Sequence, residues 1–540
     1  MRPLDASYDP GKARRRHHST QKTAPEPAGA AASVPVLYLH PAKQGPNFRP
    51  EADTGRPYGL IPLGLPALVN VLRANGIPVK GLIHPLEKQL DPDFSLENWL
   101  RSQPGARVIL IDLHWYEHCY GAVETARLCK KVLPAAWTVL GGLSATGWAD
   151  EILEQFPAVD FIIRGDAEQP LLELVRRLLA SRTHEDVFDG LEAVPNLSYR
   201  QTSGASPVVT ATPQSYTACT ADLDTLDFVN LDFIEHYQEY FVHEYIVTDL
   251  TAARQALETH PFLGRWTCTA RGCKFHCSYC GGSKESHKRL ANRNGITTRS
   301  PEKVVDDLRQ LQAQGVHQAS MSYDIAVLGE DYWRPFFSLL RASGLKIGVY
   351  NEFFQMPERA FIEEYARSVD MTHSCVALSP LSGNERVRRL NGKHYSNDQL
   401  FDILDALAAH NFYLFIYFSM NLPGETAETF EESLELARSI YEFYPHPLLK
   451  ILNTVHTLDP VSPMNLYPEK YGIQARMSTF MDFYNYCRDT RSGGPGARTE
   501  LHRGFNLNES ADRSLESMSN AWDRARQGRE VSWWPVPPSW

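Results

Sequence analysis

Short apolar segments alternate with helix-like segments in two separate blocks of this sequence, and this alternation limits the possible folds more than any other feature. Apolar strands joined by helices form parallel sheets, because a parallel connection needs a crossover long enough to hold a helix. In the first block the expected strands are residues 34–40, 79–84, 106–113, 137–142 and 160–164. We therefore predict an α/β, doubly wound (Rossmann-like) domain over residues 34–200.

The second block, residues 256–459, repeats the strand–helix unit and predicts a partial (β/α)6 barrel. Its expected strands are residues 265–268, 317–323, 346–353, 372–378, 412–421 and 448–456. Functional side chains of parallel barrels lie at the carboxyl ends of the strands. Around the two blocks we expect a disordered tail at 1–33, a linker at 201–255, and a mainly helical C-terminal region at 460–540. Residues 196–200 and 206–212 predict a small hairpin at the start of the linker.

The composition excludes several classes of function. The 540 residues carry a net charge of −10, and no basic stretch is interleaved with aromatic residues, which argues against nucleic-acid binding. No run of eighteen apolar residues is present, so we expect no membrane span. Residues 1–33 lack the apolar core of a signal peptide, and most of the nine cysteines are scattered. Free thiols indicate a reducing compartment, which predicts a cytoplasmic protein.

Three cysteines stand close together in the second block. Cys273, Cys277 and Cys280 have the spacing C-x3-C-x2-C, with Tyr279 just before the last cysteine. Three thiolates can hold three irons of a [4Fe–4S] cluster, whereas an electron-carrying ferredoxin supplies a fourth cysteine. The fourth iron would then be open for a substrate or cofactor. The alternative is a zinc site with His276 or Cys268 as fourth ligand, although zinc sites usually consist of C-x2–4-C pairs.

The run 267–282 resembles the signature of the radical S-adenosylmethionine (SAM) enzymes, in which the open iron chelates SAM. The resemblance implies SAM contacts at Tyr279, Ser379 and Arg386. Asp324 stands where the family has a Gly-Gly-Glu-like turn, so it either contacts SAM or approaches the open iron. Asp324, which ends the second barrel strand, is a candidate catalytic residue, as are Tyr350 and Glu352, which we expect to point inward from the third strand.

The first block resembles the cobalamin-binding domain that precedes many radical SAM domains. Three segments carry the resemblance: residues 62–65, 139–146 and 159–168. It implies that cobalamin contacts Gly141, Gly142, Ser144, His114 and Tyr116. The run that begins at Asp112 departs from D-x-H-x-x-G, since Glu117 replaces the glycine. We therefore do not expect His114 to bind cobalt.

Together the two resemblances imply a cobalamin-dependent radical SAM methyltransferase. Such an enzyme moves a methyl group from SAM through methylcobalamin to a carbon of a small-molecule or peptide natural-product substrate, with an external flavodoxin-type or ferredoxin-type electron donor. The run 280–283 also resembles the subgroup with tryptophan 2-C-methyltransferases, so both radical and polar transfer stay open. The alternatives are a non-methylating rearrangement or cyclisation, and a non-catalytic metal-binding regulator.

Overall fold

A computed structural model of the chain describes residues 34–49, 60–183, 185–203, 206–243, 264–445, 448–456, 458–490, 504–507 and 514–527. All of them belong to the unit Val34–Trp540. The expected tail at 1–33 lies outside the described residues, as do residues 528–540.

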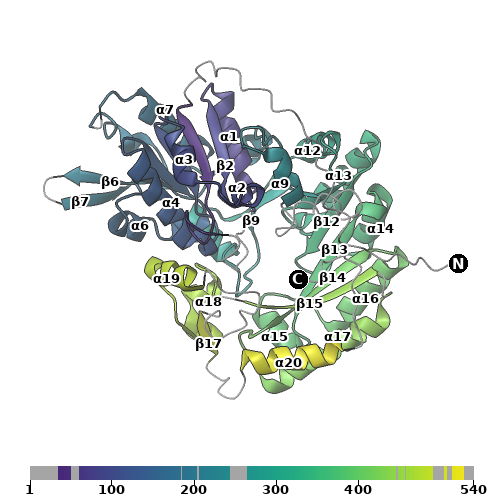
Figure 1. Cartoon of the computed structure of the whole chain (residues 1–540). Helices are drawn as coiled ribbons and strands as arrows, with labels where there is room; N and C mark the ends of the chain where they lie inside the picture. Colours follow the sequence, from purple (N-terminus) through teal and green to yellow (C-terminus); the bar gives the residue numbers. More distant parts are fainter. Residues whose placement is uncertain are drawn as a thin grey trace, which may run out of the picture. The chain divides into compact units, whose positions relative to one another are not determined.

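The first sheet has the order β2-β1-β3-β4-β5-β6-β7, and its first five strands are parallel. Figure 1 shows its two ends, with β2 at one and the β6–β7 hairpin at the other. The five parallel strands are β1 (Val36–His40), β2 (Val79–Ile83), β3 (Val108–Asp112), β4 (Trp137–Gly141) and β5 (Phe161–Ile163). All five predicted strands are therefore confirmed. The order 2-1-3-4-5 places a topological switch point between β1 and β3, where ligands of such sheets bind.

Helices cover both faces of this sheet because side chains alternate along each strand. Leu37 and Ile109 belong to one buried cluster, whereas Val36 and Val108 belong to another on the opposite face. The helices are α1 (Gly64–Ala74), α2 (His84–Leu90), α3 (Leu96–Arg101), α4 (Cys119–Val132), α5 (Leu143–Gly147), α6 (Ala149–Gln155) and α7 (Glu168–Ala180). The doubly wound arrangement is thus confirmed.

The hairpin expected in the linker is part of the first sheet. Strands β6 (Leu197–Ser203) and β7 (Ser206–Ala211) are antiparallel, and β6 pairs with β5. This pairing uses the backbone groups along the edge of β5, which an open edge would leave unpaired. After the hairpin come α8 (Thr220–Asp224) and α9 (Tyr237–His243). The segment between them packs on the same domain through Phe233 and Ile234.

The second sheet is parallel throughout, with the order β15-β14-β13-β12-β11-β8. Its strands are β8 (Arg265–Thr267), β11 (Gln318–Met321), β12 (Gly348–Phe353), β13 (Cys375–Leu381), β14 (Tyr413–Met420) and β15 (Leu449–Val455). Its helices are α11 (Lys284–Ala291), α12 (Pro301–Ala313), α13 (Glu330–Ser343), α14 (Arg359–Ser368), α15 (Glu385–Leu390), α16 (Asn397–Ala409) and α17 (Ala427–Phe443). The six parallel strands, joined by helices, confirm the partial barrel.

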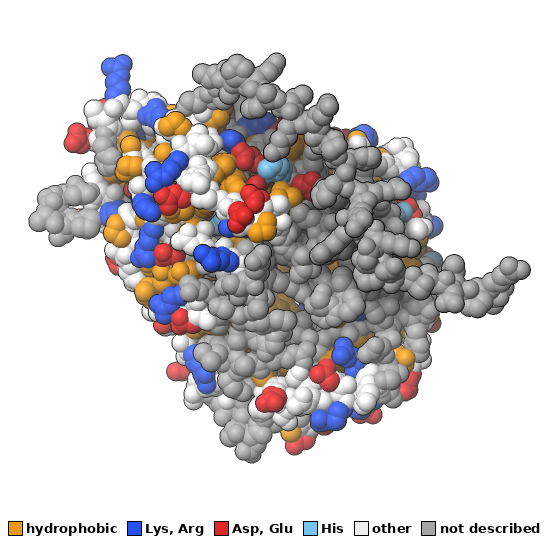
Figure 2. All heavy atoms as spheres, viewed as in Figure 1, with side chains coloured by type: hydrophobic (Ala, Val, Ile, Leu, Met, Phe, Trp, Pro, Cys, Tyr) orange, Lys and Arg blue, Asp and Glu red, His pale blue; other side chains and the backbone are white. Residues whose placement is uncertain are grey.

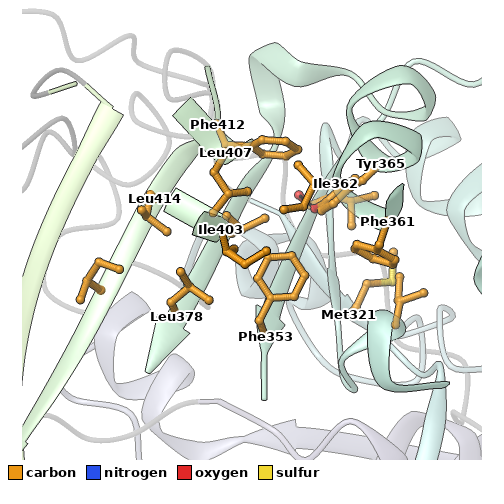
Figure 3. Packing of buried hydrophobic residues seen from close by; sticks show 14 of the residues in the cluster. Met321, Phe353, Phe361, Ile362, Tyr365, Leu378, Ile403, Leu407, Phe412 and Leu414 are labelled. Carbon is orange, nitrogen blue, oxygen red and sulfur yellow. Dashed lines mark hydrogen bonds between the residues drawn. The ribbon is translucent and has the colours of Figure 1, made fainter. Parts of the chain in front are cut away.

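The main core of this domain lies between the sheet and its helices. Figure 3 shows Phe353, Leu378 and Leu414 of three neighbouring strands packed beside Phe361 of α14 and Ile403 of α16. These side chains are nearly inaccessible to solvent, and their alternation along the strands leaves every second residue on the inner face.

The C-terminal region packs against both domains. Its elements are α18 (Pro463–Leu466), β16 (Ile473–Ala475), α19 (Phe480–Thr490), β17 (Phe505–Leu507) and α20 (Leu515–Arg526). Phe483 of α19 contacts Trp148 of the first domain, with ring centroids 4.8 Å apart. Trp522 of α20 contacts Phe418 of β14 at 5.5 Å. No helix among the described residues is long and apolar enough to cross a membrane. On the face in Figure 2, acidic and basic side chains are interspersed.

Candidate functional site

Cys273 is the last residue of β9 (Ala270–Cys273), and Cys277 and Cys280 lie in the loop between β9 and α11. Strand β9 pairs in antiparallel fashion with β10 (Gly295–Thr298), and Ser283 caps the first turn of α11. The backbone N–H of Phe275 donates to Cys273 Sγ at 3.4 Å, and that of Gly282 donates to Cys280 Sγ at 3.3 Å. Such donors favour thiolates and tune iron–sulfur clusters. The loop therefore offers three sulfur ligands with backbone donors at two of them.

Burial raises the pKa of the Cys277 and Cys280 thiols, and neighbouring acidic and thiol groups raise the pKa of Cys280 further. A bound iron would offset this effect because it stabilises the thiolate. Among the described residues, no three His, Cys, Asp or Glu side chains converge on a single metal ion. A [4Fe–4S] cluster does not require such convergence, since each thiolate binds a different iron.

The two residues considered as a fourth zinc ligand have other surroundings. Cys268 is buried in an apolar cluster with Phe228, and its thiol lies 3.9 Å from the carbonyl oxygen of Ala270. His276 forms an ion pair with Glu285 of α11. Neither contact points to a shared zinc site with the three cysteines.

Neighbouring segments hold the cysteine loop in place. The backbone at Gly392 lies so close that an added Cβ would be 2.6 Å from Cys277 Cα and 3.1 Å from its Sγ. The N–H of Gly281 donates to Asp459 Oδ2 at 2.6 Å, and burial raises the pKa of Asp459 to about 7. The loop is therefore fixed by residues that follow α15 and β15.

A cavity of about 400 Å³ lies at the carboxyl ends of the first sheet. It is lined by residues of that sheet and by residues just before Cys273, among them Asp112, His114, Gly141, Gly142, Asp166, Glu168, Ala270, Arg271 and Gly272. Its volume is within the range of small-molecule pockets. Strand β9 therefore forms part of the cavity wall and ends at the first cysteine of the motif.

The predicted cobalamin residues divide into lining and supporting positions. A Cβ on Gly141 would meet only the carbonyl oxygen of Ile163, at 3.9 Å, so the space over this glycine is open. Gly142 has φ +119°, and its Cβ would lie 2.6 Å from His114 Cα. Ser144 donates to the carbonyl oxygen of His114 at 3.0 Å. Gly142 and Ser144 thus support the backbone of His114.

His114 and Tyr116 have different environments. Burial lowers the pKa of His114 to about 4, so the imidazole that lines the cavity is neutral. Tyr116 is not among the lining residues; its ring packs against Phe483 of α19, with centroids 5.6 Å apart. The contact of Tyr116 with cobalamin stays a prediction.

Asp112 is paired with residues of β1. The Tyr38 hydroxyl donates to Asp112 Oδ1 at 2.7 Å, and His40 Nδ1 lies 3.0 Å from the same oxygen. Burial acts to raise the pKa of Asp112, but the charge and hydrogen bond of His40 lower it overall. His40 was not among the residues predicted from the sequence. The available signal was a histidine at the end of one apolar strand and an aspartate at the end of another.

Two arginines join the hairpin of β9 and β10, which carries the cysteine loop, to the first domain. Arg271 Nη1 lies 3.1 Å from Asp166 Oδ1 and 2.7 Å from Glu168 Oε1, and Arg293 pairs with Asp166 Oδ2. The other oxygen of Glu168 is buried and has no hydrogen-bond partner among the described residues. Sequence analysis did not single out these four residues as a site. Glu168 therefore offers a free acceptor in the wall of the cavity.

Of the candidate catalytic residues, Asp324 has the most hydrogen bonds. Its carboxylate accepts from the backbone of Ala326 at 3.0 Å, from Asn351 Nδ2 at 3.0 Å and from the backbone of Phe354 at 2.8 Å. Burial raises its pKa to about 6. These bonds show that Asp324 stabilises the loop after β11, and its contact with SAM or iron stays a prediction.

The other candidates lie on or beside the barrel. Tyr279 stacks on His456, with ring centroids 4.2 Å apart. Ser379 donates to Glu352 Oε1 at 3.0 Å, which brings two predicted residues together. Arg386, on α15, donates to the carbonyl oxygen of Gly424 at 3.3 Å. The contact of Arg386 with SAM stays a prediction.

Comparison with known proteins relates these features to a family. Residues 267–437 match the family model described as the Radical SAM superfamily. The anaerobic magnesium-protoporphyrin IX monomethyl ester cyclase of Cereibacter sphaeroides is 23% identical over 324 residues, which are 59% of this chain and 47% of the relative. An uncharacterized methyltransferase of Pyrococcus horikoshii is 21% identical over 392 residues, 68% of this chain and 76% of the relative.

The chain spans about half the length of the two curated cyclases that it matches. Among solved structures, the radical SAM methyltransferase TsrM from Kitasatospora setae, with cobalamin and a [4Fe–4S] cluster bound, aligns with a TM-score of 0.60. The alignment covers 92% of each chain at 14% sequence identity. This likeness shows a common fold.

Proposed function

We propose that this chain, which carries a radical SAM domain within the fold of the cobalamin-dependent radical SAM enzymes, methylates a carbon atom of a small-molecule or peptide substrate. One observation carries the proposal: β9 ends at Cys273 and also lines the cavity at the carboxyl ends of the first sheet. A cluster on the cysteine loop and a cofactor in that cavity would therefore share a wall.

The residues of each site suit the group assigned to it. Cys273, Cys277 and Cys280 would bind the cluster, and Tyr279, Ser379 and Arg386 are the proposed SAM contacts. A corrinoid is larger than a cavity of about 400 Å³, so only part of cobalamin would lie there. Open space over Gly141 and the free carboxylate oxygen of Glu168 fit a bulky ligand with amide N–H donors.

When bound, the cluster would supply single electrons to SAM, and cobalamin would carry the methyl group. The protein residues would hold these groups. In the polar form of the reaction, the substrate carbon loses a proton and gains the methyl group, and SAM becomes S-adenosylhomocysteine. An external flavodoxin-type or ferredoxin-type protein is the proposed electron donor.

Cyclisation is the second candidate function, because a relative 23% identical over 324 residues is named as a cyclase. The two reactions differ in the mass of the product. With SAM that carries a deuterated methyl group, methylation adds a labelled methyl to the substrate, whereas cyclisation adds no label. Mass spectrometry of products from the reconstituted enzyme therefore separates them, and unlabelled products would exclude methyl transfer.

The cluster assignment has a test of its own. Cys277→Ala should abolish the visible absorbance of the cluster after anaerobic reconstitution, because one of three iron ligands is lost. Cys268→Ala is the matched control, since Cys268 lies on the same segment and packs in an apolar cluster. Equal cluster content in the two variants would contradict the assignment.

A further inference from the structure

The inner face of the second sheet differs from its outer face. Along β12, Val349 and Phe353 are buried in the core, whereas Tyr350 and Glu352 on the opposite face are partly exposed. Tyr417 of β14 is partly exposed in the same way. Tyr350 and Tyr417 pack at the edge of a small buried cluster that contains Phe415, and both remain partly accessible from this face.

Aromatic rings cover much of this inner face. The ring centroids of Trp266 and Tyr350 are 5.9 Å apart, and those of Tyr350 and Phe415 are 6.5 Å apart. The rings of Phe415 and Tyr417 are stacked, at 6.2 Å. Four rings from three strands thus form a continuous aromatic surface that can hold an apolar group.

One carboxylate, Glu352, lies among these rings. Burial, followed by the charge of Glu352, raises the pKa of Tyr350 and Tyr417, so both remain neutral phenols. The Ser379 hydroxyl donates to Glu352 Oε1 at 3.0 Å. Glu352 is partly exposed and lies beside apolar rings, so it loses part of its hydration, and a cation bound next to it would offset that loss.

The described residues do not provide that charge. No Lys, Arg or His side chain in the described part of the chain forms an ion pair with Glu352. Lys393 Nζ donates to the carbonyl oxygen of Phe354 at 3.1 Å, and Arg388 donates to that of Ser382 at 2.8 Å. Burial lowers the pKa of His456 to about 4, so this imidazole is neutral.

We propose that Glu352 binds the protonated amine of the substrate, and that the substrate is an organic ammonium compound with an aromatic or extended apolar body. A carboxylate forms strong charge-assisted hydrogen bonds to an ammonium group. Ring faces of Tyr350 and Tyr417 attract the same cation, and Phe415 packs against the apolar body. The inference rests on the proposed function in one respect, namely that the bound compound is the methyl acceptor.

The test measures binding to the cluster-reconstituted full chain without turnover. Tryptamine is the cationic probe, and 3-methylindole is a neutral probe with the same ring. We expect dissociation constants from equilibrium dialysis to be at least about tenfold lower for tryptamine, because only tryptamine pairs with the carboxylate. Glu352→Gln should remove this difference and leave the affinity for 3-methylindole unchanged.

Glu363→Gln, on the exposed surface of α14, is the matched control and should preserve the preference for tryptamine. Cluster absorbance and circular dichroism show whether each variant is folded. If Glu352→Gln does not fold, Ser379→Ala serves as the second variant. It removes the hydroxyl that orients Glu352 and should weaken tryptamine binding severalfold, by about 3- to 10-fold.

Two results would overturn the inference. One is equal affinity of the two probes for the unaltered chain. The other is a Glu352→Gln variant that keeps tryptamine affinity but loses affinity for S-adenosylhomocysteine, which would place Glu352 at the SAM site. Binding and methylation are measured separately. A chain that binds tryptamine through Glu352 but never gives labelled product would refute the proposed function alone.

Discussion

The two parallel sheets of this protein differ in how their faces are used. Buried apolar clusters lie on both faces of the first sheet, so its functional groups are confined to the carboxyl ends of the strands. The second sheet has its main core on the outer face, and its inner face carries partly exposed polar and aromatic side chains. The first sheet can therefore contact a ligand only at the carboxyl ends of its strands, whereas the second sheet can contact one across its inner face.

The sharpest test of this difference compares the two faces of the second sheet. Phe353→Ala on the outer face should lower the free energy of unfolding by about 3–5 kcal/mol, because it opens a cavity in the core. Leu452→Ala on the inner face should cost about 1 kcal/mol, because this side chain is already partly exposed. Denaturant unfolding measures both. Equal losses would contradict the distinction between the faces.

The second test concerns the ion pairs that connect the first domain to the hairpin of β9 and β10. Arg271→Met leaves Glu168 and one oxygen of Asp166 without their cation, and we expect a loss of about 3 kcal/mol in unfolding free energy. Arg359→Met, which breaks exposed pairs with Asp402 and Asp405, is the control and should have a much smaller effect, because solvent screens exposed ion pairs. Similar effects of the two substitutions would show that the connection is weak.

A third test addresses the two glycines at the carboxyl end of β4 in the first sheet. Gly142→Ala should destabilise the fold by about 2–3 kcal/mol, because φ is +119° and the new Cβ would lie 2.6 Å from His114 Cα. Gly141→Ala should leave thermal stability nearly unchanged, because the space over Gly141 is open. It should, however, weaken cobalamin binding measured by spectroscopy. Unchanged cobalamin affinity in Gly141→Ala would remove this glycine from the proposed site.

The smallest expected effect is a pH dependence of the stability of the protein, caused by Asp324 in the loop after β11. Burial raises the pKa of Asp324 to about 6, so the folded chain retains a proton that the unfolded chain releases near pH 4. Stability should therefore fall as the pH rises from about 4 to about 6, by on the order of 2 kcal/mol. Asp324→Asn should flatten this part of the profile. A profile unchanged by the substitution would assign the dependence to another group.

Much of the fold could be predicted because its signals are local. Each parallel strand is a short apolar run, and the helices between them have caps or apolar periodicity that involve neighbouring residues only. The hairpin of β6 and β7 was expected, but its pairing with β5 was not, because no local sequence pattern shows which strands pair across a sheet. The cysteine loop was predictable for the same reason as the strands: its three ligands lie within eight residues.

The sites were less predictable where distant residues meet. Asp112 and His40 are 72 residues apart, and Arg271 and Asp166 are 105 apart. Neither pair has a spacing that a motif could reveal. Gly142 and Ser144 were predicted to contact a cofactor, which stays a prediction; the structure adds that both lie against the backbone of His114, a partner that no local pattern identifies.

By itself, the sequence determined two blocks of parallel strands and a three-cysteine loop with an open-site spacing, because alternation and spacing act over a few residues. Only the tertiary structure decided that β9 lines the cavity of the first domain and that Arg271 links the two. It alone placed Glu352 beside aromatic rings, with no ion-pair partner among the residues that the structure describes. These features depend on which strands lie side by side and which face each residue occupies, and packing of the whole chain sets both.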